Sequence, residues 1–148
     1  MAWDKTWEKI FSNNEWGKYP AESLIRFIAR NFYKVNNRES IKILEVGCGP
    51  GANLWYMNRE GFTVYGIDGS ETAIKKAEKR LKEDIWDGKG NYSLQVGDII
   101  SLPFEDNFFD AVIDCEVTYA NKYTEAKKMF AEMYRVVRGG DNVYSNVC

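Results

Sequence analysis

The sequence predicts an α/β fold, a doubly wound parallel sheet with helices on both of its faces. Short apolar runs rich in β-branched residues alternate along the chain with segments of helical periodicity. Such alternation is typical of a parallel sheet, because each strand connects to the next through a right-handed crossover. At 148 residues with 45% hydrophobic residues, the chain is large enough for one core. We therefore expect a single domain, residues 1–148.

The first 40 residues are expected to form two helices. Residues 2–11 carry large apolar side chains at helical spacing, and so do residues 21–33. Pro20 suits the first turn of the second helix, where its missing N–H costs nothing. The positions expected on the buried face of that helix are Leu24, Ile25, Ile28, Ala29 and Phe32.

Strands and helices alternate from residue 41 onward. Apolar runs predict strands at residues 41–46, 62–68, 92–98, 108–115 and 142–147. Helical periodicity predicts helices at residues 52–60, 70–85 and 124–138. Ser70 is expected to cap the N-terminus of the helix at 70–85, and Gly139-Gly140 to close the helix at 124–138.

Charge and composition exclude several classes of function. A net charge of −2 provides no broad positive field, so nucleic acid is not expected as a partner. No apolar run approaches the ~20 residues that span a bilayer, and the N-terminus does not resemble a signal peptide, which predicts a cytoplasmic protein with no membrane partner. The absence of histidine excludes Ser-His-Asp and Cys-His catalysis. Cys48, Cys115 and Cys148 lack zinc-site spacing, so we expect reduced thiols and no metal.

Polar or small residues end the first four predicted strands. Glu45 and a glycine loop at 47–51 end the first, Asp68 the second, Asp98 the third and Cys115 the fourth. Because the carboxyl ends of parallel strands meet at one edge, these residues are expected to line one crevice. The loop alone could be a tight turn, and Asp68 alone could cap the next helix. Together they favour an adenosine-containing ligand, whose ribose diol a carboxylate can bind.

Two adenosine cofactors remain after this step. The stretch GCGPGA (47–52) can be aligned with the dinucleotide-binding pattern, so NAD is not excluded by spacing. However, Glu45 would repel a pyrophosphate, and the chain lacks a second mononucleotide half to hold nicotinamide. S-adenosylmethionine carries a ribose diol, an adenine amine, an ammonium and a sulfonium, but no phosphate. A pocket rimmed by Glu45, Asp68 and Asp98 suits these groups.

Four successive stretches also carry a resemblance to a known family. They are ILEVGCGPGANLWYM, VYGIDGSETAIKKAEKR, VGDIISLPFEDNFFDAVID and EMYRVVRGG. In order and spacing they resemble the motifs of class I S-adenosylmethionine-dependent methyltransferases of the small-molecule type, over about residues 41–140. The resemblance implies a Rossmann-like core at 41–148 and N-terminal helices at 1–40 that form a lid. The N-terminal segment is similar to that of the thiopurine and tellurite-resistance branch.

The resemblance also implies roles for individual residues. Glu45 and the glycine loop would face the methionine part of S-adenosylmethionine, Asp68 would hold the ribose, and Asp98 would bind the adenine amine. No catalytic residue is assigned, and Glu116 and Tyr119 are the nearest candidates for a base. The implied cofactor-binding residues are Glu45, Gly47, Cys48, Gly49, Asp68, Gly69, Ser70, Asp98, Ile99, Cys115, Trp16 and Tyr19.

The chain departs from the family pattern after the fifth strand. Family members continue into an antiparallel hairpin, so its absence would leave the fifth strand as a bare edge. A truncation, a homodimer that covers the edge, or a different pairing of residues 142–147 would each account for this. The expected function is methyl transfer to a small molecule. The alternatives are a cofactor-binding but catalytically idle fragment or assembly partner and, third, an NAD-dependent oxidoreductase.

Overall fold

The computed structural model describes residues 19–115, 121–139 and 142–146. Five parallel strands form one sheet in the order β3-β2-β1-β4-β5. The strands are β1 (Lys42–Val46), β2 (Thr63–Asp68), β3 (Tyr92–Val96), β4 (Ala111–Cys115) and β5 (Val143–Asn146). The helices are α2 (Glu22–Phe32), the 3₁₀ turn η1 (Arg38–Ser40), α3 (Ala52–Arg59), α4 (Glu71–Glu83) and α5 (Tyr123–Val136). The predicted doubly wound parallel sheet is confirmed.

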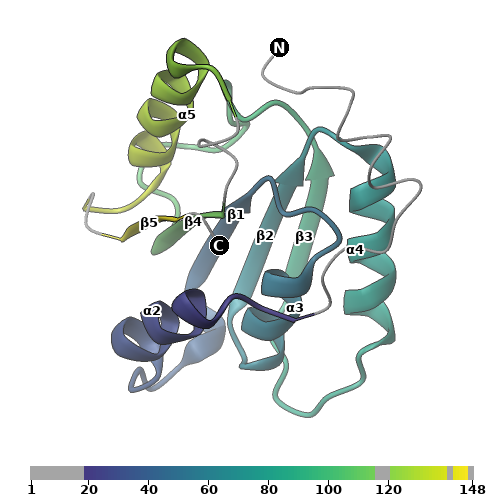
Figure 1. Cartoon of the computed structure of the whole chain (residues 1–148). Coiled ribbons are helices and arrows are strands. Elements are labelled where there is room, and N and C mark those ends of the chain that lie inside the picture. Colours follow the sequence, from purple (N-terminus) through teal and green to yellow (C-terminus); the bar gives the residue numbers. More distant parts are fainter. Residues whose placement is uncertain (1–18, 116–120, 140–141, 147–148) are drawn as a thin grey trace.

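The strand order reverses at β1, which pairs with β2 on one side and with β4 on the other. Ligands of open parallel sheets bind beyond the carboxyl ends of the strands at such a switch point. The loops that follow β1, β2 and β4 therefore surround the place where a ligand is expected. Figure 1 shows these strands side by side, with helices on either side of the sheet.

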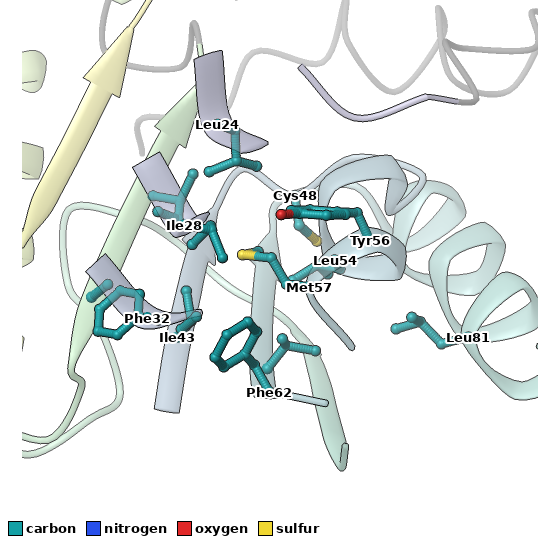
Figure 2. Close-up of a cluster of buried hydrophobic side chains, with 13 residues drawn as sticks. Leu24, Ile28, Phe32, Ile43, Cys48, Leu54, Tyr56, Met57, Phe62 and Leu81 are labelled. Atoms are coloured by element: carbon teal, nitrogen blue, oxygen red, sulfur yellow. The ribbon is translucent and has the colours of Figure 1, made fainter. Parts of the chain in front are cut away.

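One face of the sheet is covered by α2, α3 and α4. The three apolar positions that repeat along α2, Leu24, Ile28 and Phe32, are buried as the sequence predicts. They pack with side chains from β1 and α3, including Met57, which is fully buried. Figure 2 shows these side chains pointing toward one another between the helices and the sheet.

The opposite face is covered by α5 and by the segment between β3 and β4. That segment contains no α-helix, and its aromatic and aliphatic side chains fill the layer that a helix would otherwise occupy. Met129, Met133 and Val136 of α5 pack there against Leu102 and Phe109 of the segment. The two cores make the sheet the middle layer of three.

Most predicted elements are confirmed within a residue or two at each end, but two details differ. Pro20 lies outside α2, because Ala21 is the residue that precedes its first turn. The prediction that Gly139-Gly140 closes α5 is wrong. The helix ends at Val136, and Val137 is already extended, where it pairs with Phe109 beside β4.

Residues 142–147 were expected either to pair as the fifth strand or to pair differently. The pairing as a fifth strand is confirmed, since Val143–Asn146 pair in parallel with β4 and form one edge of the described sheet. A homodimer that covers this edge stays a prediction. The expected helix at 2–11 lies outside the described residues. Within the part of the chain described here, no helix is both long enough and apolar enough to cross a membrane.

Candidate cofactor site

The loop after β1 turns in the left-handed region at each of its three glycines. The φ angles are 63° at Gly47, 54° at Gly49 and 92° at Gly51, values that a side chain would disfavour. The loop is held to the end of β2, since the Gly47 amide donates to the Ile67 carbonyl at 2.7 Å. A Cβ on Gly51 would lie 3.0 Å from the Ala77 Cβ of α4. The third glycine therefore serves the close packing of α3 against α4, while the first two belong to the part of the loop that directly follows β1.

Asp68 fastens the glycine loop at the end of β2. Its side chain is only 2% exposed, and its two oxygens accept hydrogen bonds from the Gly49 amide (2.8 Å) and the Ser70 amide (2.9 Å). Ser70 caps α4 as predicted, because its Oγ accepts from the Ala73 amide at 3.0 Å. Asp68 thus has a structural role at the loop, whereas the cap of α4 that the sequence left open for it is supplied by Ser70.

Glu45 is the most unusual group at the strand ends. The residue is 2% exposed, and its Oε2 accepts a hydrogen bond from Asn53 Nδ2 at 2.8 Å. Its Oε1 is buried and has no hydrogen-bond partner among the described residues. Burial raises the pKa of Glu45 to about 8, and the negative charges of Asp68 and Asp114 act in the same direction against the lowering effect of Asn53. A buried carboxylate oxygen without a partner is costly, so this atom indicates a missing donor.

Three buried carboxylates therefore meet at the carboxyl ends of the central strands. Asp114, at the end of β4, is 0% exposed and accepts a hydrogen bond from Ser145 Oγ of β5 at 2.8 Å. Its negative charge and that of Asp68 both act on Glu45, so this edge of the sheet is acidic. Such a site attracts a cationic group and repels a phosphate. No group of side chains within the described ranges could hold a metal ion.

The end of β3 carries a short turn at Asp98. Its Oδ1 accepts from the Ile100 amide at 3.2 Å, and its carbonyl accepts from the Ser101 amide at 3.2 Å. Ile99 is 5% exposed and packs in the core on the α5 face. The turn places Asp98 at the same edge of the sheet as Asp68, because β3 pairs with β2 in parallel. The predicted adenine contacts of Asp98 and Ile99 stay predictions.

The two cysteines in the described residues differ in oxidation state. Cys48 is a buried free thiol whose pKa is raised above its usual value by burial and then by Asp68 and Glu45. Cys115 is disulfide-bonded, so the expectation of reduced thiols is wrong for this residue. Its sulfur also accepts a hydrogen bond from Asn53 Nδ2 at 3.5 Å.

The remaining predicted residues are placed as follows. Gly69 lies between Asp68 and Ser70, directly before α4. The side chain of Tyr19 is 84% exposed, so the described chain does not cover it. Trp16, Glu116 and Tyr119 lie outside the described residues.

Asn53 is a site residue that the sequence analysis missed. It sits in the first turn of α3, and its side-chain amide contacts Glu45 of β1, Cys115 of β4 and the backbone amide of Ala21. The sequence feature that could have indicated Asn53 is a polar side chain in the helical turn that directly follows the glycine loop. The position only becomes informative once the loop is folded, because the loop brings α3 back against β1.

Comparison with known proteins places the chain in a family. Residues 43–140 match the family described as "Methyltransferase domain", and the chain belongs to that family. It is 31% identical over 127 residues to the sterol 24-C-methyltransferase of the yeast Kluyveromyces lactis, covering 82% of this chain and 33% of the yeast protein. The chain thus spans about a third of the length of this curated relative.

Two solved structures have a similar fold. The PH0226 protein of Pyrococcus horikoshii OT3 has a TM-score of 0.66 at 30% identity, over 79% of this chain and 51% of its own. The magnesium protoporphyrin IX methyltransferase of Synechocystis PCC 6803, crystallised with bound SAH, has a TM-score of 0.66 at 22% identity, over 78% and 49% of the two chains. The second likeness shows the fold alone. The thiopurine and tellurite-resistance branch stays a prediction.

Proposed function

We propose that this chain binds S-adenosylmethionine and is the cofactor-binding core of a methyltransferase that acts on a small molecule. The observation that carries the proposal is Glu45 Oε1, a buried carboxylate oxygen with no hydrogen-bond partner in the described chain. It lies beside a glycine loop in left-handed conformation, at the switch point of the sheet. An ammonium group is the donor that such an oxygen fits best.

The charge of the site favours this cofactor over NAD. Glu45, Asp68 and Asp114 are all buried at the same strand ends. A pyrophosphate placed there would add negative charge to a negative, desolvated environment, whereas an α-ammonium and a sulfonium add positive charge. An NAD-dependent oxidoreductase is therefore disfavoured by electrostatics rather than by the spacing of the glycines.

Asp68 and Asp98 are proposed to bind the nucleoside. Asp68 accepts the Gly49 and Ser70 amides beside the glycine loop, and a carboxylate at this place is the group proposed to accept a ribose hydroxyl. Asp98 follows β3, the strand next to β2 in the sheet, so it is proposed to bind the adenine end of the nucleoside. A small-molecule acceptor, rather than a nucleic acid, is proposed because the net charge of the chain is −2.

For methyl transfer from S-adenosylmethionine, the protein mainly has to bind and orient the two reactants. When bound, S-adenosylmethionine supplies a methyl group on a sulfonium, and its leaving group is neutral. The residues of the chain hold the cofactor and keep the acceptor in line, an effect that can contribute roughly 7–11 kcal/mol. The proposal therefore needs neither an imidazole nor a metal, and no residue is assigned as a base.

Calorimetric titration with S-adenosylhomocysteine tests the proposal. Wild-type protein should bind it more tightly than NADH. Glu45→Gln should weaken binding by about 10- to 150-fold, because a hydrogen bond to a charged group contributes about 1.5–3 kcal/mol. Glu83→Gln removes an exposed carboxylate at the end of α4 and serves as the matched control. Tighter binding of NADH, or equal binding by the Glu45 variant, would overturn the proposal.

Turnover is tested separately with S-adenosylmethionine labelled in its methyl group and a panel of small-molecule acceptors. Transfer of label supports the methyltransferase. Binding without transfer to any acceptor supports the alternative, a cofactor-binding chain that is catalytically idle or acts as an assembly partner. The two measurements distinguish these functions because binding and transfer are read out independently.

A further inference from the structure

The side chain of Asn53 connects two parts of the molecule that are distant in sequence. Its Oδ1 accepts a hydrogen bond from the backbone amide of Ala21 at 3.1 Å, and its Nδ2 donates to Glu45 Oε2 at 2.8 Å. Ala21 directly precedes α2, and Glu45 belongs to β1. One amide group thus joins the start of α2 to Glu45 of the candidate site.

The orientation of the Asn53 amide is determined by its partners. The Ala21 N–H can only donate, so the oxygen of the amide must face it. The NH₂ group then necessarily faces Glu45. Asparagine is suited to this place because it combines one acceptor and two donors on a rigid plane, a combination that neither Asp nor Ser provides.

Ala21 precedes α2, which has no side-chain cap, and the Ala21 amide finds its acceptor in Asn53. The buried side chains of α2 fix the body of the helix against the sheet, but they begin only at Leu24. Asn53 therefore supplies a polar anchor at the start of α2 and connects it to Glu45.

We propose that Asn53 is a positioning residue that holds the Glu45 carboxylate and the start of α2 as one unit, so that a change in the charge of Glu45 is felt at Ala21. The functional side of this inference rests on the proposed cofactor. An ammonium at Glu45 would keep the carboxylate ionised and strengthen the bond from Asn53, because hydrogen bonds to charged groups are the stronger ones. By reciprocity, a firmer anchor at Ala21 favours the ionised, ligand-binding form of Glu45.

Several neighbouring groups influence whether the Glu45 carboxyl is ionised, and the Ala21 amide is proposed to respond to that ionisation. Asp68 from β2 and Asp114 from β4 both oppose its ionisation, and Asn53 from α3 favours it. The Cys48 thiol of the glycine loop lies near enough to Glu45 and Asp68 for its own pKa to be raised by them. Removing the Asn53 donor should therefore raise the pH at which Glu45 ionises.

The test follows two NMR signals across pH in the protein without ligand: the Glu45 carboxyl carbon and the Ala21 backbone amide. In the wild type both should titrate with one midpoint. In Asn53→Leu the Glu45 midpoint should move upward, and the Ala21 amide should lose its response. Asn53→Asp keeps an acceptor for Ala21 but loses the donor to Glu45, so the Ala21 amide should stay protected from hydrogen exchange while the Glu45 midpoint moves upward.

Asn58→Ala is the matched control, since Asn58 is a buried asparagine of the same helix that donates to the Asn91 carbonyl at 3.0 Å. It should lower stability while leaving both titrations unchanged. Independent titration of Ala21 and Glu45 in the wild type, or an unchanged Ala21 response in Asn53→Leu, would overturn the inference.

Saturation with S-adenosylhomocysteine should abolish both titrations in the wild type. If it leaves them intact, the proposed cofactor fails while the ligand-free titrations still establish the role of Asn53.

Discussion

Glu45 shows how one buried side chain can link fold and function at the scale of a residue. Its carboxylate lies in the sheet at the end of β1, where burial disfavours the charged form, and the neighbouring acids disfavour it further. A residue that served stability alone would be apolar at this position. The proposed ammonium contact would supply a donor to its Oε1 and favour the ionised form.

The raised pKa of Glu45 predicts a pH dependence of stability. The folded chain holds the proton up to about pH 8, whereas the unfolded chain releases it near the ordinary value of 4.5. The unfolding free energy contributed by this group is therefore fully present below pH 4.5 and is lost as the pH rises toward 8, at about 1.4 kcal/mol per pKa unit. Urea unfolding of wild type and Glu45→Gln should show the variant gaining relative stability as the pH rises. A difference that is constant with pH would contradict this assignment.

Asp68 is predicted to contribute to both stability and binding. Asp68→Ala removes the acceptors of the Gly49 and Ser70 amides, which should lower the unfolding free energy by about 1–3 kcal/mol. It should also weaken S-adenosylhomocysteine binding, since the Gly49 amide of the loop would lose its acceptor and the proposed ribose acceptor would be lost. Urea unfolding and calorimetry measure the two effects. A loss of stability with unaltered affinity would make Asp68 only a structural anchor.

At the scale of elements, the glycine loop sets how closely α3 approaches α4. Gly51 combines a φ of 92° with a Cβ position 3.0 Å from the Ala77 Cβ, so a side chain there would meet strain and a steric clash together. Gly88 provides a comparison, because its φ is 81° and nothing lies within 4 Å of a Cβ.

The pair of glycines therefore separates backbone strain from helix packing. Gly88→Ala should cost about 1–2 kcal/mol, the usual penalty for a left-handed residue with a side chain. Gly51→Ala should cost that amount plus about 1–3 kcal/mol for overpacking against α4. Thermal unfolding of the two variants checks the difference. Equal losses would mean that α4 can move away without cost.

At the scale of the whole molecule, Arg135 ties the helix-free connection between β3 and β4 to α5. Its guanidinium donates to the carbonyls of Phe104 (2.8 Å) and Leu102 (3.0 Å) and pairs with Asp106 and Glu132. This connection covers one face of the sheet without regular structure, so its position depends on such tertiary bonds. These contacts of Arg135 hold the connection over the core on the face of the sheet opposite α2, α3 and α4.

Arg135→Lys is predicted to lower the unfolding free energy by about 1–3 kcal/mol, because an ammonium cannot reproduce the fork of five donors. Arg138→Lys is the control, since its ion pair with Asp110 is 64% exposed on the arginine side and is expected to contribute less than about 1 kcal/mol. Urea unfolding measures both. The affinity for S-adenosylhomocysteine should be unchanged in either variant. A loss of affinity in Arg135→Lys would show that the contacts of Arg135 also affect the geometry of the cofactor site.

The sequence by itself determined the elements, their order and the acids at the strand ends. Apolar runs, helical periodicity and the Ser70 cap are local signals, and they hold in the folded chain because neighbouring residues decide them. The tertiary structure alone decided which acid is left without a donor, that Asp68 fastens the loop, that Asn53 joins α2 to β1, and that α5 stops before its glycines. The physical reason is that burial and hydrogen bonding of a polar group depend on partners far away in sequence, which no local pattern specifies.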